Sequence, residues 1–192
     1  VFFVRIDPMV RKLSHRLVVA LALAALPLIG MASPVHAQES RSIGGPFDTK
    51  RFPSQRREID GMRANDFPRL GKSYEVLSAG TSSYNCIAWS LGITNDWVWP
   101  GNTMQAFDKL NTKHGFHKMS KLDYQMQPGV EKVVLYGKTV NGRTVVTHQA
   151  RQMTDGTWTS KLGKMAVIRH ANPDSLDGPD YGHPVAVYSR KR

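Results

Sequence analysis

Two glycine turns in the second half of the chain constrain its fold more than any other feature. Asn141–Gly142 and Asp155–Gly156 each separate stretches that are rich in Val, Thr and Tyr. An Asn-Gly or Asp-Gly pair between such stretches is typical of a β-hairpin. The strands predicted in this way cover residues 132–136, 143–153 and 157–162. Because each turn reverses the chain, these strands form an antiparallel β-meander.

The segments around the meander alternate between helical and extended patterns. Before it, residues 56–64 and 103–111 have the spacing of short helices, and residues 73–78 have that of a short strand. After it, residues 164–170 and 184–189 predict two more strands. Helices that come first and antiparallel strands that follow predict an α+β domain.

The beginning of the chain is organised like an export signal. From Met9 a basic stretch precedes an apolar run over residues 17–31, and a small-residue motif follows that ends at Ala37. We therefore predict cleavage after Ala37, with residues 1–8 as an extension from an upstream start codon. An uncleaved membrane anchor is the alternative, although the apolar run is shorter than the roughly 20 residues that span a bilayer.

Composition divides the chain into three predicted parts. Residues 1–37 are the signal peptide, residues 38–55 form a flexible linker rich in Ser, Gly and charge, and residues 56–192 are the folded domain. The exported protein is predicted to be periplasmic or secreted, with no membrane span after signal cleavage. The formal net charge is +11 for the whole sequence and +8 for residues 38–192, which hold 22 Lys and Arg against 14 Asp and Glu. This charge favours polyanionic partners such as cell-wall polymers, but we expect no specific nucleic acid partner.

The single cysteine, Cys86, stands where another helix should begin. Ser83 or Asn85 can cap this helix and Gly92 can end it. In the first turn, unpaired N–H groups favour a thiolate. We expect Cys86 and Ser90 to point away from the core. A lone thiol in an exported chain can also be a small buried apolar residue or half of an intermolecular disulfide.

A cysteine nucleophile needs a base, and the predicted base is His148. It lies in the middle of the strand over residues 143–153, where a polar ring is unusual unless it faces a site. A surface histidine on the exposed face of a half-buried sheet is the alternative. A third group should orient the imidazole, and the next strand offers Ser160.

The turn between the two strands decides which residues accompany His148. A three-residue loop pairs Met153 with Thr157 and places His148, Trp158 and Ser160 on one face. A two-residue turn at Asp155–Gly156 would instead bring the alternate positions, 157, 159 and 161, to that face. We predict the three-residue loop, because a hydroxyl and an indole suit the imidazole better than a cation.

Further side chains are candidates for binding substrate. Tyr84 or Asn85, with the Cys86 backbone N–H, could meet an oxyanion. Trp97 and Trp99 in a loop, together with Trp158, could stack on a substrate. A lid in which Trp97 and Trp99 pack onto the core is an equal alternative.

Several of these motifs carry a family resemblance. The order of a Cys that opens a helix, a His in a strand and a polar residue on the next strand resembles the papain-like amidases and peptidases, in particular the NlpC-like and CHAP-like cell-wall enzymes. A narrower resemblance, to an uncharacterised family of exported bacterial domains, spans roughly residues 67–187. It is carried by Tyr84-Asn85-Cys86-Ile87-Ala88-Trp89, Trp99-Pro100, Lys132-Val133-Val134-Leu135-Tyr136, Thr147-His148-Gln149-Ala150-Arg151-Gln152 and Asp155-Gly156-Thr157-Trp158-Thr159-Ser160-Lys161-Leu162-Gly163.

The broader resemblance implies a papain-like α+β fold in which the Cys-bearing helix packs on the β-meander. It also implies a thiol hydrolase of amide bonds, with Cys86 and His148 at the two essential positions. The chain departs from these enzymes at the third position, where Ser160 stands in place of the usual His, Asn or acid.

These observations predict a monomeric, exported cysteine amidase or peptidase that acts on a peptide or cell-wall substrate. No cofactor and no metal are predicted. A non-catalytic module that binds glycan or peptide on the same scaffold is the alternative, and a toxin-like protein deamidase is a second one.

Overall fold

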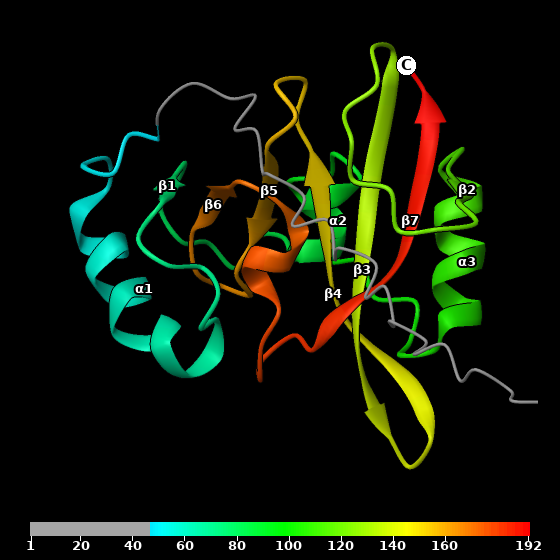
Figure 1. Cartoon of the computed structure of the whole chain (residues 1–192), viewed down its shortest axis with the longest axis horizontal. Coiled ribbons are helices and arrows are strands. Elements are labelled where there is room, and N and C mark those ends of the chain that lie inside the picture. The colour runs from blue at the N-terminus through cyan, green and yellow to red at the C-terminus, as the bar shows by residue number, and fades with distance from the viewer. Residues whose placement is uncertain (1–46) are drawn as a thin grey trace, which may run out of the picture. The chain divides into compact units, whose positions relative to one another are not determined.

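A computed structural model describes residues 47–192 (Figure 1). The predicted export signal and residues 38–46 of the predicted linker lie outside the described residues. The helices are α1 (Pro53–Asp66), α2 (Cys86–Ser90), α3 (Met104–Lys113) and the 3₁₀-helix η1 (Pro173–Leu176). The strands are β1 (Tyr74–Val76), β2 (His117–Lys118), β3 (Val130–Val140), β4 (Arg143–Gln152), β5 (Trp158–Lys161), β6 (Val167–His170) and β7 (His183–Lys191).

The strands of residues 47–192 form one sheet with the order β1-β6-β5-β4-β3-β7-β2. Every neighbouring pair is antiparallel. Strands β3 to β6 are consecutive neighbours, so the predicted meander is confirmed. β7 returns to pair with the other side of β3, and β1 pairs with β6 at the far edge. The molecule is thus of the predicted α+β class.

The first predicted hairpin turn is present at the tip of β3 and β4. Val140 pairs with Arg143 across the turn. Asn141 and Gly142 both have positive φ angles, 50° and 73°. A two-residue turn of this kind requires positive φ at both positions, and Asn and Gly tolerate it best.

The second turn has the predicted three-residue loop. The Met153 N–H donates to the Thr157 carbonyl at 2.7 Å, and the Gly156 N–H donates to the Met153 carbonyl at 3.2 Å. Gly156 has a φ of 82°. The register that follows pairs Gln152 with Trp158, so Trp158 and Ser160 share a face of the sheet.

A bulge interrupts β4 next to His148. Tyr136 pairs with His148, but Gly137 pairs with Val146, so Thr147 is an extra residue on β4. An extra residue of this kind bends its strand and ends the regular alternation of side chains. Residues on the two sides of Thr147 must therefore be assigned to a face from their contacts.

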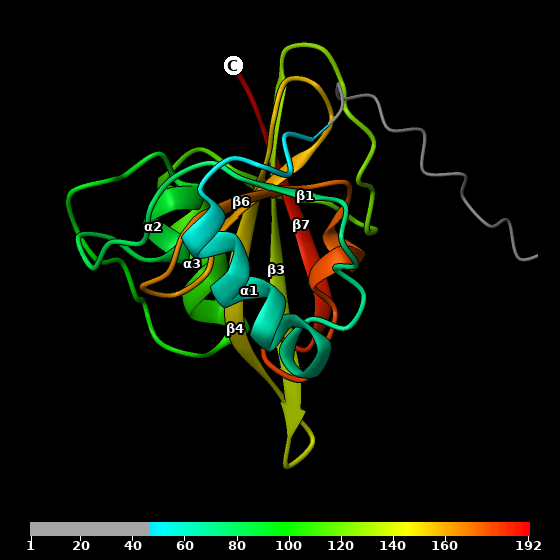
Figure 2. The ribbon, with the colours of Figure 1, turned by 90° about the vertical axis from the view of Figure 1, so that its left-hand side faces the viewer.

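Two apolar clusters lie on the two faces of the sheet, as the alternation along β3 shows. Val134 and Tyr136 belong to the α1-side cluster, and Val133 and Leu135 belong to the α2-side cluster. The α1-side cluster also includes Ile59, Tyr74, Ala150, Trp158, Ile168 and Tyr181. The α2-side cluster also includes Cys86, Ile87, Phe107, Val146 and Tyr188. In Figure 2, α2 and α3 lie on one side of the strands and the segment of η1 lies on the other.

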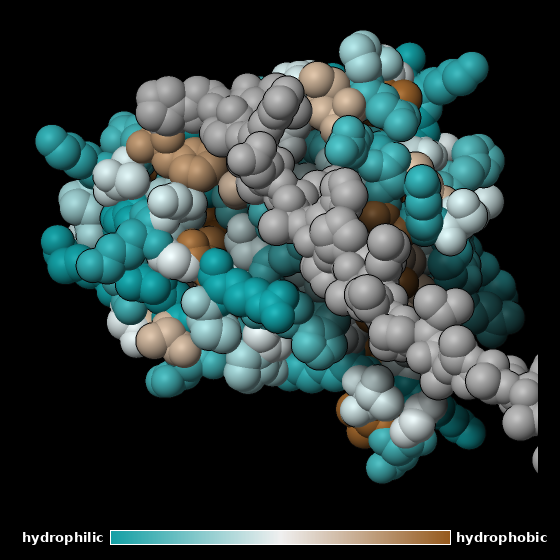
Figure 3. Space-filling view, in the orientation of Figure 1, coloured by the Kyte–Doolittle hydropathy of each residue, from teal (hydrophilic) through white to brown (hydrophobic). Residues whose placement is uncertain are grey.

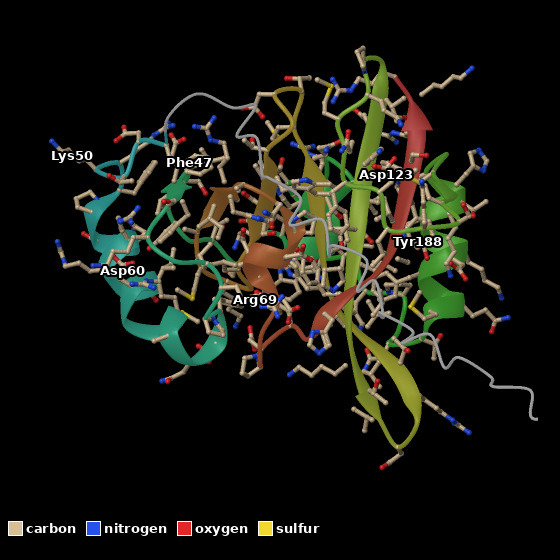
Figure 4. The ribbon with its side chains drawn as sticks, in the orientation of Figure 1. Phe47, Lys50, Asp60, Arg69, Asp123 and Tyr188 are labelled. Atoms are coloured by element: carbon tan, nitrogen blue, oxygen red, sulfur yellow. The ribbon has the colours of Figure 1, made fainter. Side chains whose placement is uncertain are left out.

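Helix α1 closes the β1 end of the α1-side cluster. It begins at Pro53 rather than near Arg56, because Pro is well suited to the first helical position. Ile59 is its buried side chain, and the Tyr74 hydroxyl donates to Asp60 Oδ1 at 3.0 Å. Figure 4 shows Asp60 on α1. These contacts attach the helix to β1.

Two fully buried lysines tie loops to the sheet. Lys132 on β3 donates to Asp123 Oδ2 at 3.2 Å and to the Gln125 carbonyl at 2.7 Å; Asp123 is labelled in Figure 4. Lys161 on β5 donates to the Thr81 carbonyl at 2.9 Å. Buried ammonium groups need such partners to offset desolvation. Lys161 thereby fixes the loop that leads into α2.

The face seen in Figure 3 is mostly hydrophilic, with hydrophobic residues in small separate areas. None of the helices within residues 47–192 combines the length and the apolar character needed to cross a membrane. The exposed large apolar side chains in this part of the chain are four: Trp97, Trp99, Leu122 and Val140. Two of them lie in one loop, which concentrates exposed apolar surface there.

Candidate functional site

The helix predicted at Cys86 is the five-residue α2. Asn85 caps it, since its Oδ1 accepts the Ala88 N–H at 3.0 Å. The prediction that Cys86 and Ser90 point away from the core is wrong: Cys86 is 6% exposed and Ser90 is 1% exposed. A helix this short, set between the sheet and the loop over residues 91–103, is covered on several sides.

The Cys86 thiol lies in an apolar setting. It belongs to the α2-side cluster with Leu135 and Val146. Burial raises the pKa of Cys86 to about 11, although a hydrogen bond from the Gln149 backbone N–H acts in the opposite direction. The regular pairing of β4 with β5 is confined to Arg151 and Gln152, which frees the Gln149 N–H for the sulfur. In this state the group is a thiol at neutral pH.

His148 belongs to the other face of the sheet. It pairs with Tyr136 of the α1-side cluster, and the two ring centroids are 5.3 Å apart. Its imidazole also stacks on Tyr181, with a centroid distance of 3.9 Å and an interplanar angle of 4°. His148 is fully buried, and neither ring nitrogen has a hydrogen-bond partner among residues 47–192. Burial lowers its pKa to about 3.

The predicted pairing of Cys86 with His148 is therefore absent from this structure. The thiol and His148 both contact the same part of β4, because the Gln149 backbone N–H binds the sulfur and His148 directly precedes Gln149. The ring contacts of His148 with Tyr136 and Tyr181 nevertheless place the imidazole in the α1-side cluster, while the thiol packs in the α2-side cluster. The surface-histidine alternative is also wrong, since the ring is fully buried.

Ser160 orients a different histidine from the one predicted. Its Oγ lies 3.0 Å from Nε2 of His170, and Nδ1 of His170 lies 2.8 Å from the Asn172 carbonyl. A carbonyl only accepts, so Nδ1 carries the proton and Ser160 donates to Nε2. Burial lowers the pKa of His170 to about 4. His170 on β6 lies one strand beyond Ser160, and sequence alone did not reveal that β6 would pair with β5.

The two residues proposed for an oxyanion site are held by local contacts. Asn85 is 3% exposed, and its Nδ2 donates to the Val98 carbonyl at 2.8 Å. Tyr84 is 9% exposed and stacks on Trp89 at a centroid distance of 6.0 Å. In this structure Asn85 links the start of α2 to the loop that carries the tryptophans.

Trp158 is part of the core and not a substrate-binding side chain. It is 1% exposed and meets the ring of Tyr124 edge-on at 6.1 Å. Its position opposite Gln152 on the central strands directs it into the α1-side cluster. The prediction that it contacts substrate is wrong for this reason.

Trp97 and Trp99 form an exposed aromatic surface, here called the tryptophan platform. Each is 47% exposed, while Val98 between them is half-buried against the core. The indole N–H of Trp97 donates to the Ser82 carbonyl, and that of Trp99 donates to Asn102 Oδ1 at 2.7 Å. Both rings are thus fixed at their polar edges and keep apolar surface open to solvent. The alternative of a lid packed onto the core holds in part, because Val98 packs on the α2-side cluster and the Trp99 ring meets the buried Phe107 ring edge-on at 6.0 Å.

A pocket of about 400 Å³ begins directly after the tryptophan platform. It runs along α3 and is here called the α3 pocket. Its lining residues are Pro100, Thr103, Gln105, Ala106, Lys109, Leu110 and Lys113. The sequence carried a signal for it, because positions 105, 109 and 113 recur at i, i+4 and must share one face of the helix.

Metal-ligating residues do not converge in the described region. Within residues 47–192 no group of three or more His, Cys, Asp or Glu side chains is placed to hold a metal ion. The loop acid Asp177 is already engaged, by His183 Nδ1 at 2.7 Å and by Arg69 at 3.0 Å.

Residues 75–189 match a family described as "Domain of unknown function (DUF7689)". The chain belongs to this family. The matched region covers more than half of the chain and runs from β1 into β7. Comparison with curated proteins and with solved structures gave no match.

The DUF7689 region contains strands β2 to β6 and most of β1 and β7, together with every predicted site residue. Helix α1 lies before it, although its Ile59 is part of the α1-side cluster. The tryptophan platform and the α3 pocket therefore belong to the DUF7689 domain, in the segment between α2 and the meander.

Proposed function

We propose that this DUF7689 protein is an exported, non-catalytic binding module, and that its tryptophan platform holds a glycan of the cell envelope. The observation that carries the proposal is the exposure of Trp97 and Trp99, each 47%, which are separated by one residue in the same loop. Large aromatic side chains normally bury most of their surface, and an exposed group of them indicates a binding site.

The contacts of the platform suit a sugar ring. The indole N–H groups are already bound to Ser82 and Asn102, so the platform offers apolar faces more than hydrogen bonds. Flat, fixed aromatic faces contact the C–H surface of a sugar with little loss of side-chain entropy on binding. Asn85 anchors the same loop through Val98, which keeps the platform in place before a ligand arrives.

Export gives the module access to envelope glycans. The N-terminal pattern of a basic stretch, an apolar run and a small-residue motif supports a periplasmic or secreted location. Residues 38–192, with a formal net charge of +8, are also attracted to the anionic polymers found there.

A papain-like thiol hydrolase is the second candidate, and one observation favours it. The Cys86 sulfur accepts the Gln149 N–H, while the preceding residue, His148, has two ring nitrogens without a partner among residues 47–192. Activity would require the imidazole and the thiol to meet in a water-accessible state. Such an enzyme pairs a thiolate with an imidazolium. In the present arrangement a thiol pKa near 11 keeps Cys86 protonated and an imidazole pKa near 3 keeps His148 neutral, so both oppose this ion pair.

A sedimentation assay with purified peptidoglycan sacculi separates the two candidates. We expect the wild-type protein and Cys86→Ala to bind equally and to release no soluble fragments, and Trp97→Ala/Trp99→Ala to lose at least tenfold in affinity. Val140→Ala, another exposed apolar site, is the matched control and should bind like wild type. Fragments released by wild type but not by Cys86→Ala would establish the hydrolase instead. A platform variant that binds like wild type would refute the module.

A further inference from the structure

Two lysines give the α3 pocket a positive charge. Lys109 and Lys113 lie one turn apart on α3 and both line the pocket. Within residues 47–192 neither takes part in an ion pair. Paired lysines beside a pocket favour an anionic ligand, since each ammonium can bind a carboxylate.

The one acid of helix α3 is held on another side of the helix. Asp108 accepts the hydroxyl of Tyr188 and lies 3.3 Å from Lys118. Figure 4 places Tyr188 on β7, beside α3. Asp108 is thus occupied by residues of the sheet, and it is not among the residues that line the pocket.

The floor of the pocket is less polar than its lysine rim. Ala106 and Leu110 are half-buried lining residues, while Gln105, Lys109 and Lys113 are exposed. A site with an apolar base and a row of polar ends suits a ligand that has both C–H surface and charged or hydroxyl groups. Sugars that bear carboxylates combine these two properties.

The pocket continues the tryptophan platform. Pro100, which follows Trp99, is its first lining residue. The other end of the platform is acidic, because Asp96 precedes Trp97 and accepts its backbone N–H at 2.7 Å. Charge therefore changes from negative to positive along the loop and α3. An anionic ligand that stacks on the platform is directed toward α3 and away from Asp96.

We propose that the ligand of this module is a carboxylate-bearing glycan, stacked on Trp97 and Trp99 with its carboxylates bound by Lys109 and Lys113 in the α3 pocket. This inference rests on the proposed function and adds the chemical class of the ligand and its direction. Peptidoglycan strands carry carboxylates on their stem peptides, and on lactyl groups that bear no peptide, whereas uronic acid polymers carry them on the sugar ring.

Titration calorimetry on the full-length protein tests the inference. The probes are soluble peptidoglycan strands, the same strands with amidated carboxylates, polygalacturonate and carboxyl-reduced polygalacturonate. We expect amidation or reduction to weaken binding about tenfold. Lys109→Gln/Lys113→Gln should weaken binding to the acidic forms by a similar factor and leave the neutral forms unchanged. The acidic probe that binds more tightly identifies which source of carboxylate the site fits.

A charge-matched control separates the pocket from the general positive charge of the protein. Lys72→Gln/Lys164→Gln removes the same charge from exposed sites elsewhere and should leave binding within twofold of wild type. Equal loss in both double variants, or amidated strands that bind as tightly as acidic ones, would overturn the inference while the platform proposal stands. If no probe binds to wild type, the proposed function itself fails.

Discussion

The imidazole of His148 lies flat on the phenol ring of Tyr181, with centroids 3.9 Å apart and planes 4° apart. The Thr147 hydroxyl binds the Tyr181 backbone carbonyl, so the bulge in β4 fixes the loop that supplies the stacking ring. This arrangement places a fully buried, neutral histidine where the sequence had suggested a base. It has consequences for stability that can be measured.

The protein should lose stability in mild acid. The pKa of His148 is about 3 and that of His170 about 4 in the folded state, against about 6.5 in an unfolded chain. Between these values the unfolded state binds more protons, so stability falls as pH decreases below about 6.5. We expect a loss of about 2 kcal/mol per histidine between pH 7 and pH 5.

Urea unfolding at the two pH values measures this loss. His148→Phe retains a ring that can stack on Tyr181 and removes the two unpaired nitrogens. It should reduce the pH-dependent loss by about 2 kcal/mol, which is the share of one histidine. The same pH dependence in wild type and His148→Phe would show that His148 is not buried as a neutral group.

Cys86 should resist alkylation in the folded protein. With a pKa near 11, only about a thousandth of the thiol is ionised at pH 8, and the buried sulfur is shielded as well. Mass spectrometry after iodoacetamide treatment should show labelling in 6 M urea and almost none in native buffer. Rapid native labelling at pH 7 would contradict the buried thiol and revive the hydrolase.

The meander and its register could be predicted because the decisive signals are local. Asn141–Gly142 and Gly156 set the two turns, and a turn determines which residues pair across it. The shared face of Trp158 and Ser160 followed from the loop length alone. These features depend on a few consecutive residues, which the sequence displays directly.

The faces of the sheet could not be assigned in the same way. Residues 133 to 136 on β3 are all fully buried, because both faces of the sheet are covered. A strand buried on both sides reads as a continuous apolar run, so its alternation does not say which helix covers which face. The sequence therefore could not reveal that α2 would pack on the face away from His148, nor that His170 would come to Ser160.

Gly182 should be among the positions least tolerant of a side chain. It has a φ of 74°, and a Cβ there would overlap the carbonyl group of Gly137. Gly129 is a matched control, because it has a φ of 73° but open space where a Cβ would be added. We expect Gly129→Ala to cost about 1 kcal/mol from backbone strain alone, and Gly182→Ala to cost at least about 2 kcal/mol more. Equal urea midpoints for the two variants would contradict the close approach of Gly182 to the Gly137 carbonyl.

Ser160 should couple energetically to His170 and not to His148. The Ser160 hydroxyl donates to His170 at 3.0 Å in a fully buried site, so Ser160→Ala leaves Nε2 without its donor and should cost about 1 to 3 kcal/mol. A double-mutant cycle of Ser160→Ala with His170→Phe should give a coupling of about 1 kcal/mol. The cycle of Ser160→Ala with His148→Phe should give no more than about 0.5 kcal/mol, as for residues without a shared hydrogen bond. The reverse order of the two couplings would restore the predicted Ser160–His148 pair and contradict the Ser160–His170 hydrogen bond.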